Sequence, residues 1–160
     1  MAILTRNNIK YLVGHCSAAR NTKVEDISDI DAMHKAKGWS QVGYHYFICR
    51  SGLIQVGRPE WVQGAHVYGY NQESLGFCLG GGLDANGKIL EGFENAFTPE
   101  QGNSLISLLY SLTRKYPKAE VVGHRDLSPD VNGDGEITRE EWLKNCPCFD
   151  INEWMNINIR

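Results

Sequence analysis

The sequence lacks any hydrophobic run long enough to cross a membrane, and it has no excess of positive charge. Its longest stretch without charged residues covers residues 101–113 and contains Ser, Gln and Asn, whereas a membrane-spanning helix needs about 18 apolar residues. Sixteen Lys and Arg residues against nineteen Asp and Glu residues give a net charge of -3, so the basic surface that follows nucleic-acid phosphates is missing. We therefore expect neither a membrane nor a nucleic acid as a partner.

Cysteines are few and odd in number, five in 160 residues. The first residues include Arg6 and Lys10 but no apolar core before a small-residue cleavage site, so we expect no secretory signal peptide and a chain that stays in the cytoplasm of the cell that makes it. A disulfide framework is not expected there. We interpret the cysteines as buried thiols or metal ligands, with core thiols predicted at Cys16, Cys49 and Cys78.

The chain also lacks linkers, repeats and low-complexity segments. Its length fits one domain, and its 42% apolar and 22% charged residues are typical of a globular protein. We expect a single domain over residues 1–160 that acts as a monomer.

Helix signals occur at several places. Thr22 and Glu25 have the spacing of a capping box, and apolar residues at helical spacing follow, which predicts a helix over about 23–37. Thr98, Pro99 and Gln101 form a second start signal, which predicts a helix over 99–116. Two short helices are predicted over 139–145 and 151–156.

Short apolar and aromatic runs predict the strands. They cover residues 11–13, a hairpin of 44–49 and 53–56, and residues 74–79 and 121–122. Strands mixed with helices indicate an α/β fold in which one central sheet is flanked by helices.

Two histidines, His15 and His124, each follow a glycine at the end of an apolar strand. Strand ends are where α/β folds place functional side chains. A catalytic zinc site uses three protein ligands, and Cys146 or Cys148 could supply the third.

These residues lie in motifs that resemble, in order along nearly the whole chain, the phage lysozyme-type N-acetylmuramoyl-L-alanine amidases, which share a fold with the peptidoglycan recognition proteins. The motifs cover residues 12–18, 38–39, 42–48, 52–57, 65–66, 69–71, 74–76, 81–82, 97–99, 123–126 and 146–150.

The resemblance implies one mixed central sheet and a zinc ion bound by His15, His124 and Cys146. It also implies that Tyr44 and Lys144 assist catalysis. The implied reaction is hydrolysis of the amide between N-acetylmuramic acid and L-alanine in bacterial peptidoglycan. A phage or prophage endolysin that waits in the host cytoplasm fits this reading.

The sequence also suggests roles for the three remaining histidines. His66 lies in a Gly-rich segment within a resembling motif, and we expect it to contact the substrate. His45 is interpreted as structural and His34 as helix surface.

Two alternatives stay open for the third zinc ligand. Cys148 lies two residues beyond Cys146, and the segment between His124 and Cys146 is longer than in the phage lysozymes and contains Asp126, Asp130 and Asp134. Some related amidases use an Asp there. For function, the alternatives are a non-catalytic peptidoglycan-binding module of the same fold and a calcium-dependent interaction protein.

The calcium alternative rests on residues 130–141, DVNGDGEITREE. Acidic and amide side chains occupy positions 1, 3, 5 and 12 of an EF-hand-type loop, and Gly135 occupies position 6. A structural calcium ion would use Asp130, Asn132, Asp134, Glu136 and Glu141. The other reading is an acidic surface insertion that needs no ion.

Overall fold

A five-stranded sheet forms the centre of the computed structural model, which describes residues 2–159. The strand order is β4-β3-β5-β1-β7. β1, β3, β5 and β7 are parallel, and β4 is antiparallel to β3. The prediction of one mixed central sheet with helices is confirmed. The strands are β1 (Tyr11–Cys16), β3 (Tyr46–Ile48), β4 (Ile54–Val56), β5 (Ser74–Leu79) and β7 (Glu120–Gly123).

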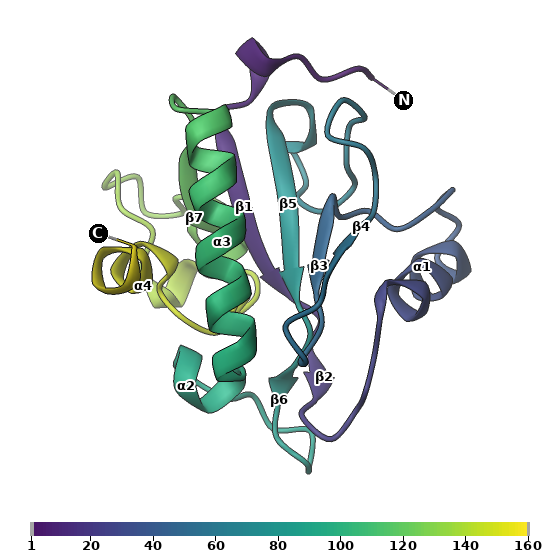
Figure 1. Cartoon of the computed structure of the whole chain (residues 1–160). Coiled ribbons are helices and arrows are strands. Elements are labelled where there is room, and N and C mark those ends of the chain that lie inside the picture. Colours follow the sequence, from purple (N-terminus) through teal and green to yellow (C-terminus); the bar gives the residue numbers. More distant parts are fainter. Residues whose placement is uncertain (1, 160) are drawn as a thin grey trace.

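A parallel pair beside the main sheet and several helices complete the chain (Figure 1). The pair consists of β2 (Ala19–Arg20) and β6 (Gly82–Leu83). The α-helices are α1 (Ile27–Ala36), α2 (Phe93–Ala96), α3 (Pro99–Lys115) and α4 (Ile151–Asn158). The short 3-10 helices are η1 (Arg6–Asn8), η2 (Asn71–Glu73), η3 (His124–Leu127) and η4 (Arg139–Glu141).

Helix α3 runs along one face of the sheet (Figure 1). It begins where its sequence predicts, because Thr98 and Gln101 form a capping box and Pro99 occupies the first turn. Its apolar stripe then packs on the sheet, and the buried leucines are Leu105, Leu108, Leu109 and Leu112.

Alternation along β5 separates the two faces of the sheet. Leu75, Phe77 and Leu79 pack in the core with α3, whereas Cys78 faces the opposite side together with Phe47 and Ile30 of α1. The face opposite α3 also carries His15, because His15 is paired in register with Cys78. This second face therefore positions the candidate site.

Two predicted helices differ from the structure. The helix predicted over 23–37 is α1, which begins only after Asp26 because Asp26 and Asp29 form its capping box, not Thr22 and Glu25. Glu25 is buried and accepts a hydrogen bond from Ser17 instead. The helix predicted over 139–145 shrinks to η4, although its Thr138–Glu141 capping box is present.

Within residues 2–159, the helices do not combine the length and the apolar character that a membrane crossing needs.

Glu60 ties the end of α3 to the central sheet. Its carboxylate accepts hydrogen bonds from Lys115 and Tyr116, both at 2.6 Å, and from Tyr46 of β3. Burial by itself would raise the pKa of Glu60, but Lys115 and the two tyrosine hydroxyls hold that pKa below its usual value. The ionised carboxylate therefore stabilises the folded state.

We expect Glu60→Gln to lower the free energy of unfolding at pH 7 by about 1–2 kcal/mol, since hydrogen bonds to a charged group are lost. Because the folded-state pKa is depressed, this contribution is present above the unfolded pKa of about 4.3 and disappears as the pH falls through the folded pKa. Urea unfolding between pH 3 and pH 7 measures it. The exposed Glu140→Gln serves as the control, and a pH-independent difference between Glu60→Gln and the unaltered chain would contradict the assignment.

Candidate active site

The register of two parallel strands brings the strand-end histidines together. β1 pairs with β7 so that Gly14 lies opposite Gly123. A histidine follows each of these glycines, and the ring centroids of His15 and His124 are 4.7 Å apart. His15 belongs to β1 itself, since the strand is longer than the predicted 11–13, and His124 begins η3.

Cys146 approaches the two histidines from the segment before α4. The backbone N–H of Cys16 donates to its sulfur at 3.2 Å, and the backbone N–H of Arg125 donates to its carbonyl at 2.8 Å. One ligand atom each of His15, His124 and Cys146 lies within 4.8 Å of the other two. The three residues that the sequence resemblance singles out as metal ligands thus converge.

The rival ligands lie elsewhere. Asp126 accepts a hydrogen bond from the Gly123 backbone N–H at 2.7 Å, and Asp130 and Asp134 accept from backbone N–H groups of their own exposed loop. Among residues 2–159, the close group of metal-ligating side chains contains Cys146 and not Cys148. Cys148 contacts Cys16 instead, with 3.7 Å between the sulfur atoms.

The electrostatic environment keeps the two imidazoles neutral. Burial, followed by the neighbouring His66, His124 and Lys144, lowers the pKa of His15 well below its usual value. Burial and then Lys144 lower the pKa of His124. Neutral imidazole is the form that ligates a metal, so both side chains are ready to bind one at neutral pH.

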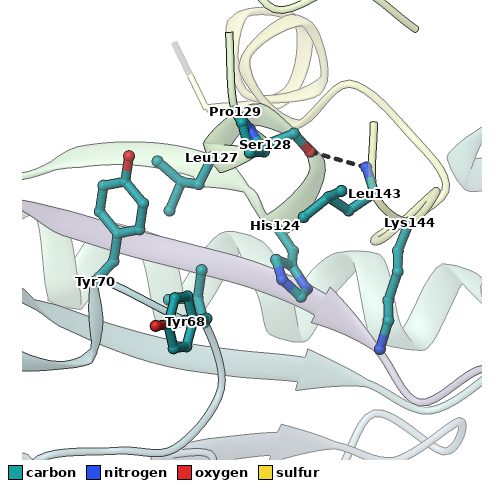
Figure 2. A pocket seen from close by; sticks show the side chains of 9 residues that line it. Tyr68, Tyr70, His124, Leu127, Ser128, Pro129, Leu143 and Lys144 are labelled. Atoms are coloured by element: carbon teal, nitrogen blue, oxygen red, sulfur yellow. Dashed lines mark hydrogen bonds between the residues drawn. The ribbon is translucent and has the colours of Figure 1, made fainter. Parts of the chain in front are cut away.

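The three side chains line a cavity of about 870 Å³ on the face opposite α3. Tyr44 and Lys144 line the same cavity. A second pocket of about 290 Å³ adjoins it and shares His124 and Lys144. Figure 2 shows these two side chains near each other, with Tyr68 and Tyr70 farther along the pocket. The candidate site thus opens in two directions from the histidines.

Tyr44 precedes β3 and packs against His15, with 5.0 Å between ring centroids. Burial, with the nearby thiols as a further cause, raises the pKa of Tyr44 well above its usual value. Its hydroxyl therefore keeps its proton at neutral pH, at the wall of the cavity and next to the Cys78 thiol. Lys144 lies in an exposed turn after η4, not on the predicted helix, and reaches the cavity from there.

His66 lines the main cavity and also contacts a candidate metal ligand. Its ring lies beside His15, and Nδ1 of His66 is 2.9 Å from Nε2 of His15. Its other nitrogen, Nε2, is 3.3 Å from the hydroxyl of Ser74. Because His66 also lines the main cavity, its contact with substrate stays a prediction.

Two residues, His34 and Cys16, lie in surroundings that differ from those predicted. His34 is buried, not on the helix surface, and its Nδ1 accepts a hydrogen bond from the Gly43 backbone N–H at 2.8 Å, next to Tyr44. A signal was present, because His34 follows the buried Ile30 by four residues on one helix face. Cys16 is half-buried and lines the cavity, whereas Cys49 and Cys78 are buried as predicted. His45 is structural as predicted, since its Nδ1 accepts from the Gly76 N–H.

The loop over residues 130–141 folds on its own polar groups. Asp130 accepts hydrogen bonds from the N–H groups of Gly133 and Gly135, and Glu141 accepts from those of Asn132 and Thr138. These contacts close the loop through side-chain-to-backbone bonds that need no ion. Calcium binding stays a prediction from the sequence pattern.

A His-His-Cys group at an open cavity, with His15 and Cys146 buried and His124 half-buried, lies beside a protonated phenol and an ammonium. This is the arrangement of a metallohydrolase. Comparison with known proteins gives the particular family. A family model described as N-acetylmuramoyl-L-alanine amidase matches residues 5–147. The chain belongs to this family and is an enzyme of that activity, and peptidoglycan is the substrate of the family.

Individual relatives agree with this assignment. The chain is 39% identical over 153 residues to the endolysin of Escherichia phage T7, a match that covers 96% of this chain and 89% of that protein. The amidase LysCS from Clostridium intestinale URNW is 26% identical with a TM-score of 0.71, covering 100% of this chain and 90% of that chain. Bumblebee PGRP-SA shares the fold, at 19% identity and a TM-score of 0.68, over 95% of this chain and 83% of that chain.

We expect His34→Leu to lower the free energy of unfolding by about 1–3 kcal/mol, because the buried Gly43 N–H loses its acceptor. The loss also loosens the segment that carries Tyr44, so amidase activity should fall as well. Thermal melting and cell-wall hydrolysis measure the two effects. Lys118→Ala, an exposed change after α3, is the control, and a melting temperature of His34→Leu equal to that of the control would contradict the role.

Proposed function

We propose that the chain is a zinc-dependent N-acetylmuramoyl-L-alanine amidase that acts as an endolysin on bacterial cell walls. The observation that carries this proposal is the convergence of His15, His124 and Cys146, with ligand atoms within 4.8 Å of one another at the wall of a large cavity. The endolysins of Escherichia phage T7 and Enterobacteria phage K11, which are similar along most of this chain, support the endolysin role.

The donor set fits zinc. Two imidazoles and one thiolate are ligands that zinc accepts in catalytic sites, and three protein ligands are the usual number there. The lowered pKa values of His15 and His124 keep their lone pairs available. When bound, the ion supplies Lewis acidity that activates water and polarises the scissile carbonyl.

Tyr44 and Lys144 supply hydrogen-bond donors on the cavity side of the ligands. The Tyr44 hydroxyl remains protonated at neutral pH because burial raises its pKa, so it can donate to the oxyanion that develops as the amide is attacked. Lys144 carries its ammonium into the same cavity beside His124. It can stabilise the same negative charge and deliver a proton to the leaving amine.

The shape of the cavity suits a substrate that extends on both sides of the scissile bond. An amide between a sugar lactyl group and a peptide needs room for both parts. The main cavity of about 870 Å³ continues past His124 and Lys144 into the pocket of about 290 Å³. Exposed aromatic side chains, Trp39 and Tyr68, line the main cavity and offer apolar faces to either part.

Digestion of purified peptidoglycan, with a chelator and with zinc restored, tests the proposal. We expect clearing of the suspension that the chelator stops and zinc restores. Mass spectrometry should find peptides with a free L-alanine amino group and intact glycan strands. Products with new reducing sugar ends would contradict the amidase assignment, and chelator-resistant clearing would contradict the zinc dependence.

We expect Cys146→Ser to lose most of its bound zinc and Cys148→Ser to retain one zinc per chain, because Cys146 belongs to the converging group. Elemental analysis after gel filtration in equimolar zinc measures the metal content. The two variants are matched controls for each other, being thiol-to-hydroxyl changes two residues apart. Loss of zinc only in Cys148→Ser would reverse the ligand assignment.

Tyr44→Phe and Lys144→Ala should each keep the fold and the bound zinc but lose about 100–1,000-fold in turnover, the usual cost of removing one donor to a developing oxyanion. Initial rates on soluble muropeptides, with zinc content measured on the same samples, separate turnover from metal loss. Tyr11→Phe, a tyrosine change away from the ligands, is the matched control. Rates equal to those of the unaltered chain would show that both residues only pack.

A further inference from the structure

A line of buried polar contacts begins at His15 and passes through His66. Nε2 of His15 is 2.9 Å from Nδ1 of His66, and Nε2 of His66 is 3.3 Å from the Ser74 hydroxyl. That hydroxyl in turn donates to the carbonyl of Tyr70 at 2.8 Å. The contacts link the candidate ligand to the first residue of β5 through one intervening imidazole.

The backbone around His66 is built to admit its ring. A Cβ at Gly76 would lie 2.6 Å from Cγ of His66, and a Cβ at Gly64 would lie 2.7 Å from its Cδ2. Real Cβ atoms do not approach so closely, so glycine is needed at both places. Asn71 anchors the same segment, because its side-chain oxygen accepts from the N–H groups of His66 and Val67 at 2.9 and 3.0 Å. The ring is therefore held in one place.

Donors and acceptors along this line of contacts can be assigned in order, starting from the Tyr70 carbonyl. The Tyr70 carbonyl can only accept, so the Ser74 hydroxyl hydrogen is committed to it. Ser74 is then the acceptor of a hydrogen from Nε2 of His66. Neutral His66 with that hydrogen has a lone pair at Nδ1, which accepts the Nε2–H of His15.

The tautomer of His15 decides which of its ring nitrogens can bind the metal. With its hydrogen on Nε2, the neutral ring has its lone pair on Nδ1, and Nδ1 is the atom that lies 3.9 Å from the sulfur of Cys146. We propose that His66 is a positioning residue that holds His15 in the Nε2–H tautomer and so presents Nδ1 to the metal. The inference rests on the zinc site of the proposed function.

A hydrogen bond that holds a ligating histidine has a measurable effect on the affinity for the metal. Metal-bound histidines ordinarily donate their second N–H to a fixed acceptor, and loss of that acceptor costs about 10–100-fold in metal affinity or activity. Here the acceptor is an imidazole whose own tautomer is set by Ser74.

Two substitutions of His66 separate hydrogen bonding from packing. His66→Asn leaves an amide oxygen near the position of Nδ1, whereas His66→Leu leaves only an apolar side chain. Zinc affinity is measured by competition with a chromophoric chelator, with folding checked by circular dichroism. We expect His66→Leu to bind zinc about 10–100-fold more weakly and His66→Asn to recover most of that loss. A folded His66→Leu with unchanged zinc affinity would overturn the proposal.

Nitrogen-15 NMR of the unaltered, zinc-loaded chain gives an answer that does not depend on how the variants fold. We expect both His15 and His66 to be protonated at Nε2 and unprotonated at Nδ1. Protonation of His66 at Nδ1 would reverse the direction of the contact and overturn the proposal. Ser74→Ala, which removes the acceptor at the far end, should increase the population of the other His66 tautomer.

The same experiments separate this inference from the proposed function. A chain that binds zinc with these tautomers but leaves peptidoglycan intact would contradict the amidase mechanism and support the role of His66. A chain that hydrolyses peptidoglycan with zinc, while the folded His66→Leu binds zinc unchanged, would contradict the role of His66 alone.

Discussion

The parallel pairing of β1 with β7 is the constraint on which the site depends. It sets Gly14 opposite Gly123 and so places the next residues, His15 and His124, side by side. Both glycines lie at close approaches, and that at Gly123 leaves no room for a Cβ. A Cβ at Gly14 would lie 3.0 Å from Ile151 of α4, and one at Gly123 would lie 2.8 Å from Pro147. The close approach at Gly123 also brings the segment with Cys146 against the strand ends, so one packing arrangement assembles all the candidate ligands.

One face of the sheet packs in the apolar core, and the other face carries the candidate site. On one face, the leucines of α3 pack on Leu75, Phe77 and Leu79 in a continuous apolar core, which stabilises the sheet by removing apolar surface from water. On the other face, buried histidines are acceptable because each has hydrogen-bond partners. His34 accepts from Gly43, His45 accepts from Gly76, and His66 lies between His15 and Ser74. These polar contacts hold the backbone of the segments that line the cavity.

Elements that depend on local signals were predicted well from the sequence, whereas features that depend on contacts between distant segments were not. Strand β5 and helix α3 were predicted nearly to the residue, because alternation and a capping box are local signals. The start of α1 was wrong because Asp26 caps the helix and Glu25 turns inward to Ser17. The predicted helix over 139–145 was too long, since an isolated capping box does not ensure a helix without an apolar face to bury. His34 was misplaced because its partner, the Gly43 N–H, comes from a separate segment.

The fold class, the family resemblance and the residue types available for chemistry could be read from the sequence, because hydrophobic periodicity, capping and motif order are local features of the chain. It left the choice among Cys146, Cys148 and the aspartates open, and it did not predict that His66 contacts His15. The three-dimensional packing groups Cys146 with His15 and His124 and places His66 beside His15 with both ring nitrogens engaged. The physical reason is that these relations depend on atoms brought within a few ångströms by strand register and close backbone approach, and a linear pattern does not carry those distances.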